Sequence, residues 1–288
     1  MYWIILGLLA ALSQTSRAAF SKSVLKNTNE YVVAYVTRLL SALIALPILF
    51  FIEIPELNLH YWLALIGAGI FLSIASIYYM KAIKLTDISL ILPLISFVPL
   101  IVVLISPFTI GEIPSIFGLV GILLIIIGSY ILNIKDRTHG YLGPLKKLLT
   151  NKGTSLMFVV TLVWALNSIM DKIGSSNSSV LFWVVTVNIV IVIILTPITI
   201  FKLGKDFKKI PSSFKKILPI SISNSAEIIT YMFAIQITLV SYVISIKRLS
   251  IFFGILIGYF IFKEKNIKPK LAGAFVMIIG VLLITLFN

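Results

Sequence analysis

The chain has 288 residues, of which 59% are hydrophobic and only 12% are charged, and it contains no cysteine. Soluble domains average about 45–50% apolar and about 25% charged residues, so this composition excludes an ordinary soluble protein and indicates an integral membrane protein. The net charge of +14 lies mostly in loops between apolar runs, where it indicates orientation in a membrane rather than binding to nucleic acid.

Apolar runs follow one another along the whole chain, and their lengths of about 18–23 residues suit helices that cross a hydrocarbon core about 30 Å thick. We therefore predict an all-α membrane protein. The ten expected transmembrane helices cover residues 2–20, 31–52, 60–82, 88–108, 114–133, 155–172, 180–201, 217–236, 240–262 and 269–287. The first run has no basic segment before it, so we expect a first span and not a cleaved signal peptide.

Positive charge divides unequally between the two ends of these spans. Nineteen of the 24 lysines and arginines lie in loops after odd-numbered spans, whereas the loops after even-numbered spans hold only Lys172, at the end of a span. The other four, Arg17, Arg38, Lys247 and Arg248, lie inside spans. Because cytoplasmic loops are enriched in basic residues, we expect the odd loops in the cytoplasm and both termini outside the plasma membrane.

The second half of the chain repeats the first. A shift of 152 residues superimposes a series of identical residues without a gap from Tyr79 to Leu132. The matched pairs are Tyr79 and Tyr231, Met80 and Met232, Ala82 and Ala234, Thr86 and Thr238, Ser89 and Ser241, Phe108 and Phe260, Glu112 and Glu264, Gly121 and Gly273, and Gly128 and Gly280. We interpret these four glycines as sites of close helix packing.

Each half thus holds five spans, and since five is an odd number, the halves must insert with opposite orientations. Inverted repeats of this kind are typical of secondary transporters, which place the substrate site between the halves. We assign the first repeat to residues 1–138, a cytoplasmic linker to 139–154 and the second repeat to 155–288.

Two segments carry a resemblance to a known family: FTIGEIPSIFGLVGILLIIIGSYIL in the first half and YFIFKEKNIKPKLAGAFVMIIGVLLITL in the second. A glutamate followed by a glycine-spaced last helix, repeated at a fixed offset, resembles the drug/metabolite transporter superfamily of the EamA type. The resemblance covers essentially the whole chain and implies a ten-helix fold. It also implies a central cavity lined by the first four helices of each half, with peripheral fifth and tenth helices. The cargo stays open, because the fold hosts transporters of many metabolites.

These features predict a secondary active transporter, an exporter or exchanger, that moves a small anionic or zwitterionic metabolite by alternating access. The expected partners are that metabolite, the lipid bilayer and either protons or a counter-substrate; a homodimer is left open, and no cofactor, metal or nucleic acid is expected. A membrane-embedded enzyme is the first alternative, disfavoured because the sequence shows no cluster of acidic residues, His or Cys near one membrane face. The second, a channel or scaffold protein, needs neither an inverted repeat nor a buried charged site.

Two adjacent cations, Lys247 and Arg248, lie well inside the ninth predicted span, where charge is costly and usually functional. The pair resembles the basic pair of phosphate-translocating relatives in the equivalent helix, whereas the first half has Ile95 and Ser96 at the matching positions. An ammonium and a guanidinium side by side can hold a carboxylate or a phosphate. We expect Arg248 to be the main binder; the alternatives are a structural ion pair with Glu227 and a Lys247 side chain that snorkels outward.

Glu227 is the only acidic residue that we place at mid-membrane depth. Two interpretations stay open: it titrates and couples transport to protons, or it forms a permanent salt bridge to Arg248 across the short hairpin between the eighth and ninth spans. Asn224, one turn earlier, either lines the cavity or bonds to a neighbouring helix.

Other buried charges are interpreted by their depth. A shift of 150 residues aligns the earlier spans of the two halves. Arg38, deep in the second span and matched by Asn188 at this shift, is assigned a gating or packing role, whereas Arg17 is expected to snorkel to the interface. Lys22 and Lys172, which match each other at helix ends, are interpreted as interfacial residues or gate residues. The remaining candidates share polar or aromatic character. Tyr79 and Tyr231 are expected to line the cavity or to anchor the helices at the membrane interface. The others line the cavity or pack between helices: Asn167, Trp164 and, opposite them, Gln14.

Overall fold

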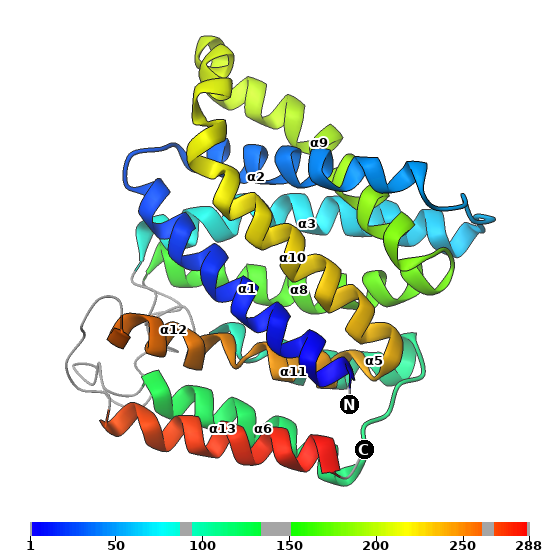
Figure 1. Cartoon of the computed structure of the whole chain (residues 1–288), viewed down its shortest axis with the longest axis vertical. Helices are drawn as coiled ribbons and strands as arrows, with labels where there is room; N and C mark the ends of the chain where they lie inside the picture. The colour runs from blue at the N-terminus through cyan, green and yellow to red at the C-terminus, as the bar shows by residue number, and fades with distance from the viewer. Residues whose placement is uncertain (1, 87–93, 134–150, 261–267, 287–288) are drawn as a thin grey trace.

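The computed structural model describes residues 2–86, 94–133, 151–260 and 268–286, and every regular element within these ranges is a helix (Figure 1). The first repeat contains α1 (Tyr2–Leu25), α2 (Glu30–Ala45) with η1 (Leu46–Phe50), α3 (Leu59–Leu85), α5 (Val98–Thr109) and α6 (Ile116–Asn133). The second contains α8 (Lys152–Ser176), α9 (Val180–Leu203) with η3 (Gly204–Ser213), α10 (Phe214–Ile237), α11 (Val240–Lys247), α12 (Ser250–Phe260) and α13 (Lys268–Leu286). The predicted all-α fold class is confirmed, and each predicted span contains a helix.

Six helical segments of the described chain are each long and apolar enough to cross a membrane: Tyr2–Leu25, Glu30–Phe50, Leu59–Leu85, Lys152–Ser176, Val180–Lys208 and Ile210–Ile237. The helices of the fourth, fifth and tenth spans are shorter but equally apolar. Large apolar side chains such as Phe50, Phe108 and Phe201 lie on the outer surface, as expected where lipid is the solvent. The protein is therefore a multi-pass membrane protein.

Matching residues of the two repeats start matching helices. Asn29 caps α2, accepting a hydrogen bond from the backbone N–H of Tyr31. Ser179, 150 residues further on, caps α9 by accepting from the N–H of Phe182. Side-chain oxygens at this position satisfy N–H groups that the first helical turn leaves without a partner. The second and seventh spans thus begin through the same local chemistry.

The packing of the helices has the symmetry of an inverted repeat. The first span of each half packs on the third span of the other half, as α1 on α10 and α8 on α3. The second spans, α2 and α9, pack on each other, and so do the last spans, α6 and α13, which lie together at one edge of the molecule (Figure 1). The start of α1 and the end of α13 lie on the same side (Figure 1), as an even number of spans requires.

The crossing of α6 and α13 shows directly that the halves are antiparallel. A Cβ atom at Gly121 would lie 2.6 Å from the carbonyl oxygen of Gly280, and one at Gly128 would lie 2.6 Å from that of Gly273. Gly121 thus meets Gly280, the repeat partner of Gly128, and Gly128 meets Gly273, the repeat partner of Gly121. The interpretation of these glycines as close-packing sites is confirmed, because a side chain would push the two backbones apart.

The fourth and ninth spans are broken at equivalent positions. In the ninth, α11 ends at Lys247 and α12 begins at Ser250, so the prediction of one continuous helix was wrong. The turn is held by the N–H of Leu249, which donates to the carbonyl of Ile246 at 2.9 Å; in the fourth span the N–H of Phe97 donates to Leu94 at 3.1 Å. A shift of 152 residues relates these two hydrogen bonds. Pro93 and Pro99 predict a kink in the fourth span, because proline removes a helical hydrogen bond. The break at Phe97 lies between them, and Pro93 itself lies outside the described residues.

Candidate functional site

A cavity of about 100 Å³ lies between the two repeats. Its lining residues come from α1, α2, α3 and α5 of the first half and from α8, α9, α10 and α11 of the second, including the C-cap of α11. None of the described lining residues comes from α6 or α13. The expected cavity between the first four spans of each half is present. Its charged lining residues are Arg17, Arg38, Asp171, Glu227, Lys247 and Arg248.

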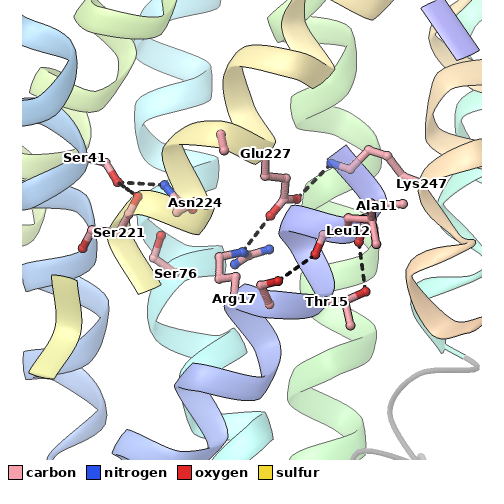
Figure 2. Close-up of polar contacts among 12 residues, drawn as sticks. Ala11, Leu12, Thr15, Arg17, Ser41, Ser76, Ser221, Asn224, Glu227 and Lys247 are labelled. Atoms are coloured by element: carbon pink, nitrogen blue, oxygen red, sulfur yellow. Dashed lines mark hydrogen bonds and ion pairs between the residues drawn. The ribbon is translucent and has the colours of Figure 1, made fainter. Parts of the chain in front are cut away.

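Glu227 forms the centre of a three-residue ion cluster. Its Oε2 atom lies 2.7 Å from Nε of Arg17, and its Oε1 atom lies 3.0 Å from Nζ of Lys247. Figure 2 shows the carboxylate of α10 between the guanidinium of α1 and the ammonium of α11. Of the two interpretations left open for Glu227, the salt bridge is present, but its partners are Arg17 and Lys247 and not Arg248. The expectation that Arg17 snorkels was wrong: its side chain is buried, because Glu227 offers a charged partner inside the protein.

Aromatic rings support the two cations of this cluster. The guanidinium carbon of Arg17 lies 4.9 Å from the ring centre of Tyr79 and 5.9 Å from that of Trp164. Nζ of Lys247 lies 4.4 Å from the ring centre of Tyr231. A cation over an aromatic face is attracted by the ring quadrupole, and more strongly when water is excluded. Tyr79 and Tyr231 are both buried, so neither is an interfacial anchor.

Arg248 also lines the cavity, but its hydrogen bonds go to the backbone. Nη1 donates to the carbonyl oxygen of Ile95 at 3.1 Å, and Nε donates to that of Ile244 at 3.3 Å. The Ile95 carbonyl lies directly before the break in the fourth span, where helical hydrogen bonding is interrupted. The cation therefore satisfies a carbonyl that the broken helix exposes.

Arg38 has the weakest set of partners among these cations. Its Nε atom donates to the hydroxyl of Ser76 at 3.0 Å, while its Nη1 atom is buried without a hydrogen-bond partner in the described part of the chain. No ion pair of Arg38 occurs among the described residues. Asn188, its counterpart in the repeat, is buried and bonds to the carbonyl of Val184, and it is absent from the cavity lining.

Asp171 was missed as a candidate because the sixth span was expected to end at residue 172. The helix α8 continues to Ser176, which places this carboxylate inside the protein. It accepts hydrogen bonds from Nδ2 of Asn167 at 2.8 Å and from Nε1 of Trp183 at 3.0 Å. Asn167 lies one helical turn before Asp171, and a polar pair at that spacing was a signal that could have found it.

Most predicted site residues therefore meet at one place. Of the ten candidates, the cavity lining includes Arg248, Lys247, Glu227, Asn224, Tyr231, Arg38, Asn167 and Trp164 and lacks Tyr79 and Asn188. Asn224 donates to the hydroxyl of Ser41 at 3.0 Å, which connects α10 to α2 (Figure 2). Tyr79 contacts the site indirectly, through Arg17 and Trp164.

The sequence pattern of the EamA-like transporter family matches residues 1–134 and, a second time, residues 151–286. The chain belongs to the EamA-like transporter family. The two matches occur once in each repeat, so the predicted resemblance is confirmed, and with it the assignment to membrane transporters of the drug/metabolite type.

A similar fold is found in a crystal structure of a protein that is 15% identical to this EamA-like chain. The match covers 99% of both chains with a TM-score of 0.74. Curated proteins include no sequence that matches this chain.

Proposed function

We propose that this EamA-like protein is a secondary active transporter that moves a small metabolite with an anionic group across the plasma membrane by alternating access. The observation that carries the proposal is the charge of the cavity. Four lining residues are cations, namely Arg17, Arg38, Lys247 and Arg248, and two are carboxylates, Asp171 and Glu227. The lining therefore has a net charge of +2.

An anionic ligand fits this imbalance on physical grounds. Buried charge is costly unless it is paired, and charged side chains inside a membrane protein usually mark a substrate path. Glu227 is already shared between Arg17 and Lys247, so it cannot offset the charge of Arg38 as well. A carboxylate or phosphate beside Arg38 would reduce the excess positive charge.

The size of the cavity favours a compact ligand. Pockets for drug-sized ligands usually measure about 300–1,000 Å³, whereas this cavity measures about 100 Å³. A ligand of a few heavy atoms fits such a volume, and a nucleotide sugar does not fit it without a wider opening. Small organic acids and zwitterions are thus favoured over larger anions.

A hydrogen bond and an ion pair between the two repeats support alternating access. Glu112, from the first half, accepts a hydrogen bond from the N–H of Val240 at 2.7 Å, and its Oε1 atom lies 3.3 Å from Nζ of Lys172. Both partners belong to the second half. Lys22, the counterpart of Lys172, lies near the end of α1 and donates instead to the carbonyl of Ile83 in α3 at 2.8 Å, a contact within the first half. Such an ion pair between halves would break and re-form as one repeat moves against the other.

Counterflow in proteoliposomes tests the proposal. Vesicles containing the purified protein are loaded with one unlabelled compound at a time from a panel of small organic acids, zwitterions, neutral polyols and amines. Accumulation of the same labelled compound is then measured. We expect saturable counterflow of at least one compound with an anionic group, recovered chemically unchanged, and none of the polyols or amines.

The outcomes separate the alternatives. Saturable exchange contradicts a channel, and unchanged substrate contradicts an enzyme. We expect Arg38→Gln to lower counterflow about tenfold or more, since a hydrogen bond to a charged group contributes about 1.5–3 kcal/mol. Lys84→Gln, which alters a partly exposed cation paired with Glu30, is the control and should retain activity. Counterflow of neutral compounds alone would overturn the proposal.

A further inference from the structure

We infer that the cavity contains two subsites of opposite charge: Arg38 binds a carboxylate of the substrate, and Asp171 binds its ammonium group. The cargo is then a compact zwitterion rather than a simple anion. This inference rests on the proposed transport function and narrows its substrate class.

The anionic end of the substrate is assigned to Arg38 because this cation has unused hydrogen-bonding capacity. A guanidinium has five N–H donors in a fixed fork. In Arg38, Nε is bonded to Ser76, whereas the buried Nη1 atom has no partner in the described residues. The other cations of the lining already have direct partners: Arg17 and Lys247 bind Glu227, and Arg248 binds backbone carbonyls.

The cationic end is assigned to Asp171 because its charge is not balanced by a direct cation partner. Its side chain is only 7% exposed, and in the described part of the chain it accepts hydrogen bonds from two neutral groups, on Asn167 and Trp183. Glu227, by contrast, is held by two cations. Each carboxylate oxygen can accept a second hydrogen bond, so Asp171 can also receive an ammonium group.

Two further acceptors lie in the lining of the same cavity. Oε1 of Gln14 and Oδ1 of Asn167 are buried and have no hydrogen-bond partner within the described residues. An ammonium group has three N–H donors and no acceptor. Gln14, Asn167 and Asp171 together supply acceptors for the three N–H donors of an ammonium group. A substrate that carries only negative charge would leave these acceptors without a donor.

Arg38 and Asp171 belong to different repeats, on α2 and α8, and both line the one cavity. Their direct hydrogen-bond partners among the described residues are neutral groups, and they form no ion pair with each other. A zwitterion placed between them offers each charge a direct partner.

Matched compounds test this assignment. One set is L-alanine, propionate and ethylamine, in which the same two-carbon unit carries both groups, the carboxylate alone or the amine alone. A second set, L-phenylalanine, 3-phenylpropionate and phenethylamine, covers a larger substituent. Binding to the purified protein is measured by the rise in its thermal midpoint, because a ligand that binds only the folded state stabilises it. Counterflow is measured on the same compounds.

We expect the zwitterion of at least one set to bind at least about tenfold more tightly than either of its partial analogues, the effect of one charged hydrogen-bonding group. In Asp171→Asn, which keeps the side chain's shape, this preference should fall to about equal binding of zwitterion and carboxylate. In Arg38→Gln, binding of the zwitterion and binding of the carboxylate analogue should weaken together. Glu30→Gln, a carboxylate outside the cavity, is the control and should retain the preference.

Two results would overturn the assignment. One is tighter binding of the carboxylate analogue than of the zwitterion in the unaltered protein. The other is an unchanged preference in Asp171→Asn. If anions are exchanged but zwitterions are not, the transport proposal stands and the two-subsite inference fails; if no compound of either set binds and the wider panel shows no counterflow, both fail.

Discussion

Arg248, beside the break in the ninth span, donates a hydrogen bond through Nη1 to the carbonyl oxygen of Ile95, beside the equivalent break in the fourth span, over 3.1 Å. The two breaks are thus joined by a side chain that only the second repeat possesses, since Ser96 is its counterpart in the first. A broken helix exposes backbone carbonyls, and in a membrane these need a donor inside the protein. Arg248 is therefore part of the scaffold of the cavity as well as part of its wall.

The first prediction concerns this contact. Arg248→Met removes the donor and leaves the Ile95 carbonyl without it, so we expect a loss of about 1.5–3 kcal/mol of stability, the contribution of a hydrogen bond from a charged group. Arg248→Lys should lose less, because an ammonium still donates. The measurement is the thermal midpoint in detergent. Equal midpoints for Arg248→Met and the unaltered protein would show that the contact contributes nothing.

The second prediction concerns the cluster at Glu227. Glu227→Gln leaves Arg17 and Lys247 buried without their shared carboxylate, and breaking a buried ion pair from one side costs about 3–5 kcal/mol. Adding Lys247→Met removes one of the two stranded cations and should recover part of the loss. A double-mutant cycle on thermal stability measures this coupling. Additive effects of the two substitutions would contradict the shared ion cluster.

The ten spans and their repeat were predictable because they depend on local composition and on residues that recur at a fixed offset. The glycine pairs Gly121 with Gly280 and Gly128 with Gly273 follow from the same repeat, since antiparallel crossing of equivalent helices brings equivalent residues together. The break at Leu249 was not predicted, whereas Pro93 and Pro99 favoured an interruption of the fourth span, where the break at Phe97 lies. Hydropathy does not record whether an apolar run is one helix or two.

The partners of the buried charges were harder to predict than the spans. Arg17 lies 210 residues before Glu227, and nothing local to either residue identifies the other. Proximity in sequence favoured a partner in the ninth span but did not distinguish Arg248 from Lys247. The two follow each other on a helix and point about 100° apart, so of this pair Glu227 binds only Lys247. Asp171 was overlooked because the apolar run that marks the sixth span ends before the helix does. The last, more polar turns of α8 were therefore not considered as part of the protein interior.

The third prediction concerns the glycines. Gly121→Ala places a Cβ atom 2.6 Å from the carbonyl oxygen of Gly280, so the helices must separate, and overpacking of this kind costs about 1–3 kcal/mol. Gly254→Ala is the matched control in an apolar helix, where the new Cβ atom would meet only Thr15, at 3.8 Å. Alanine favours a helix over glycine by about 1 kcal/mol, so this control should be neutral or more stable. Opposite shifts of the two thermal midpoints are expected, and a fall of similar size in both would contradict the close crossing of α6 and α13.

The fourth prediction concerns the orientation of the protein, which we infer from the excess of lysine and arginine in the odd loops. Because the chain has no cysteine, a single cysteine can be introduced without altering a native one. Lys26 lies between the first and second spans and Glu56 between the second and third, and both are exposed. With odd loops in the cytoplasm, a membrane-impermeant maleimide added to intact cells should label Glu56→Cys, whereas Lys26→Cys should react only after permeabilisation. The reversed pattern would place both termini in the cytoplasm, and it would show that the charge bias does not set the topology of this transporter.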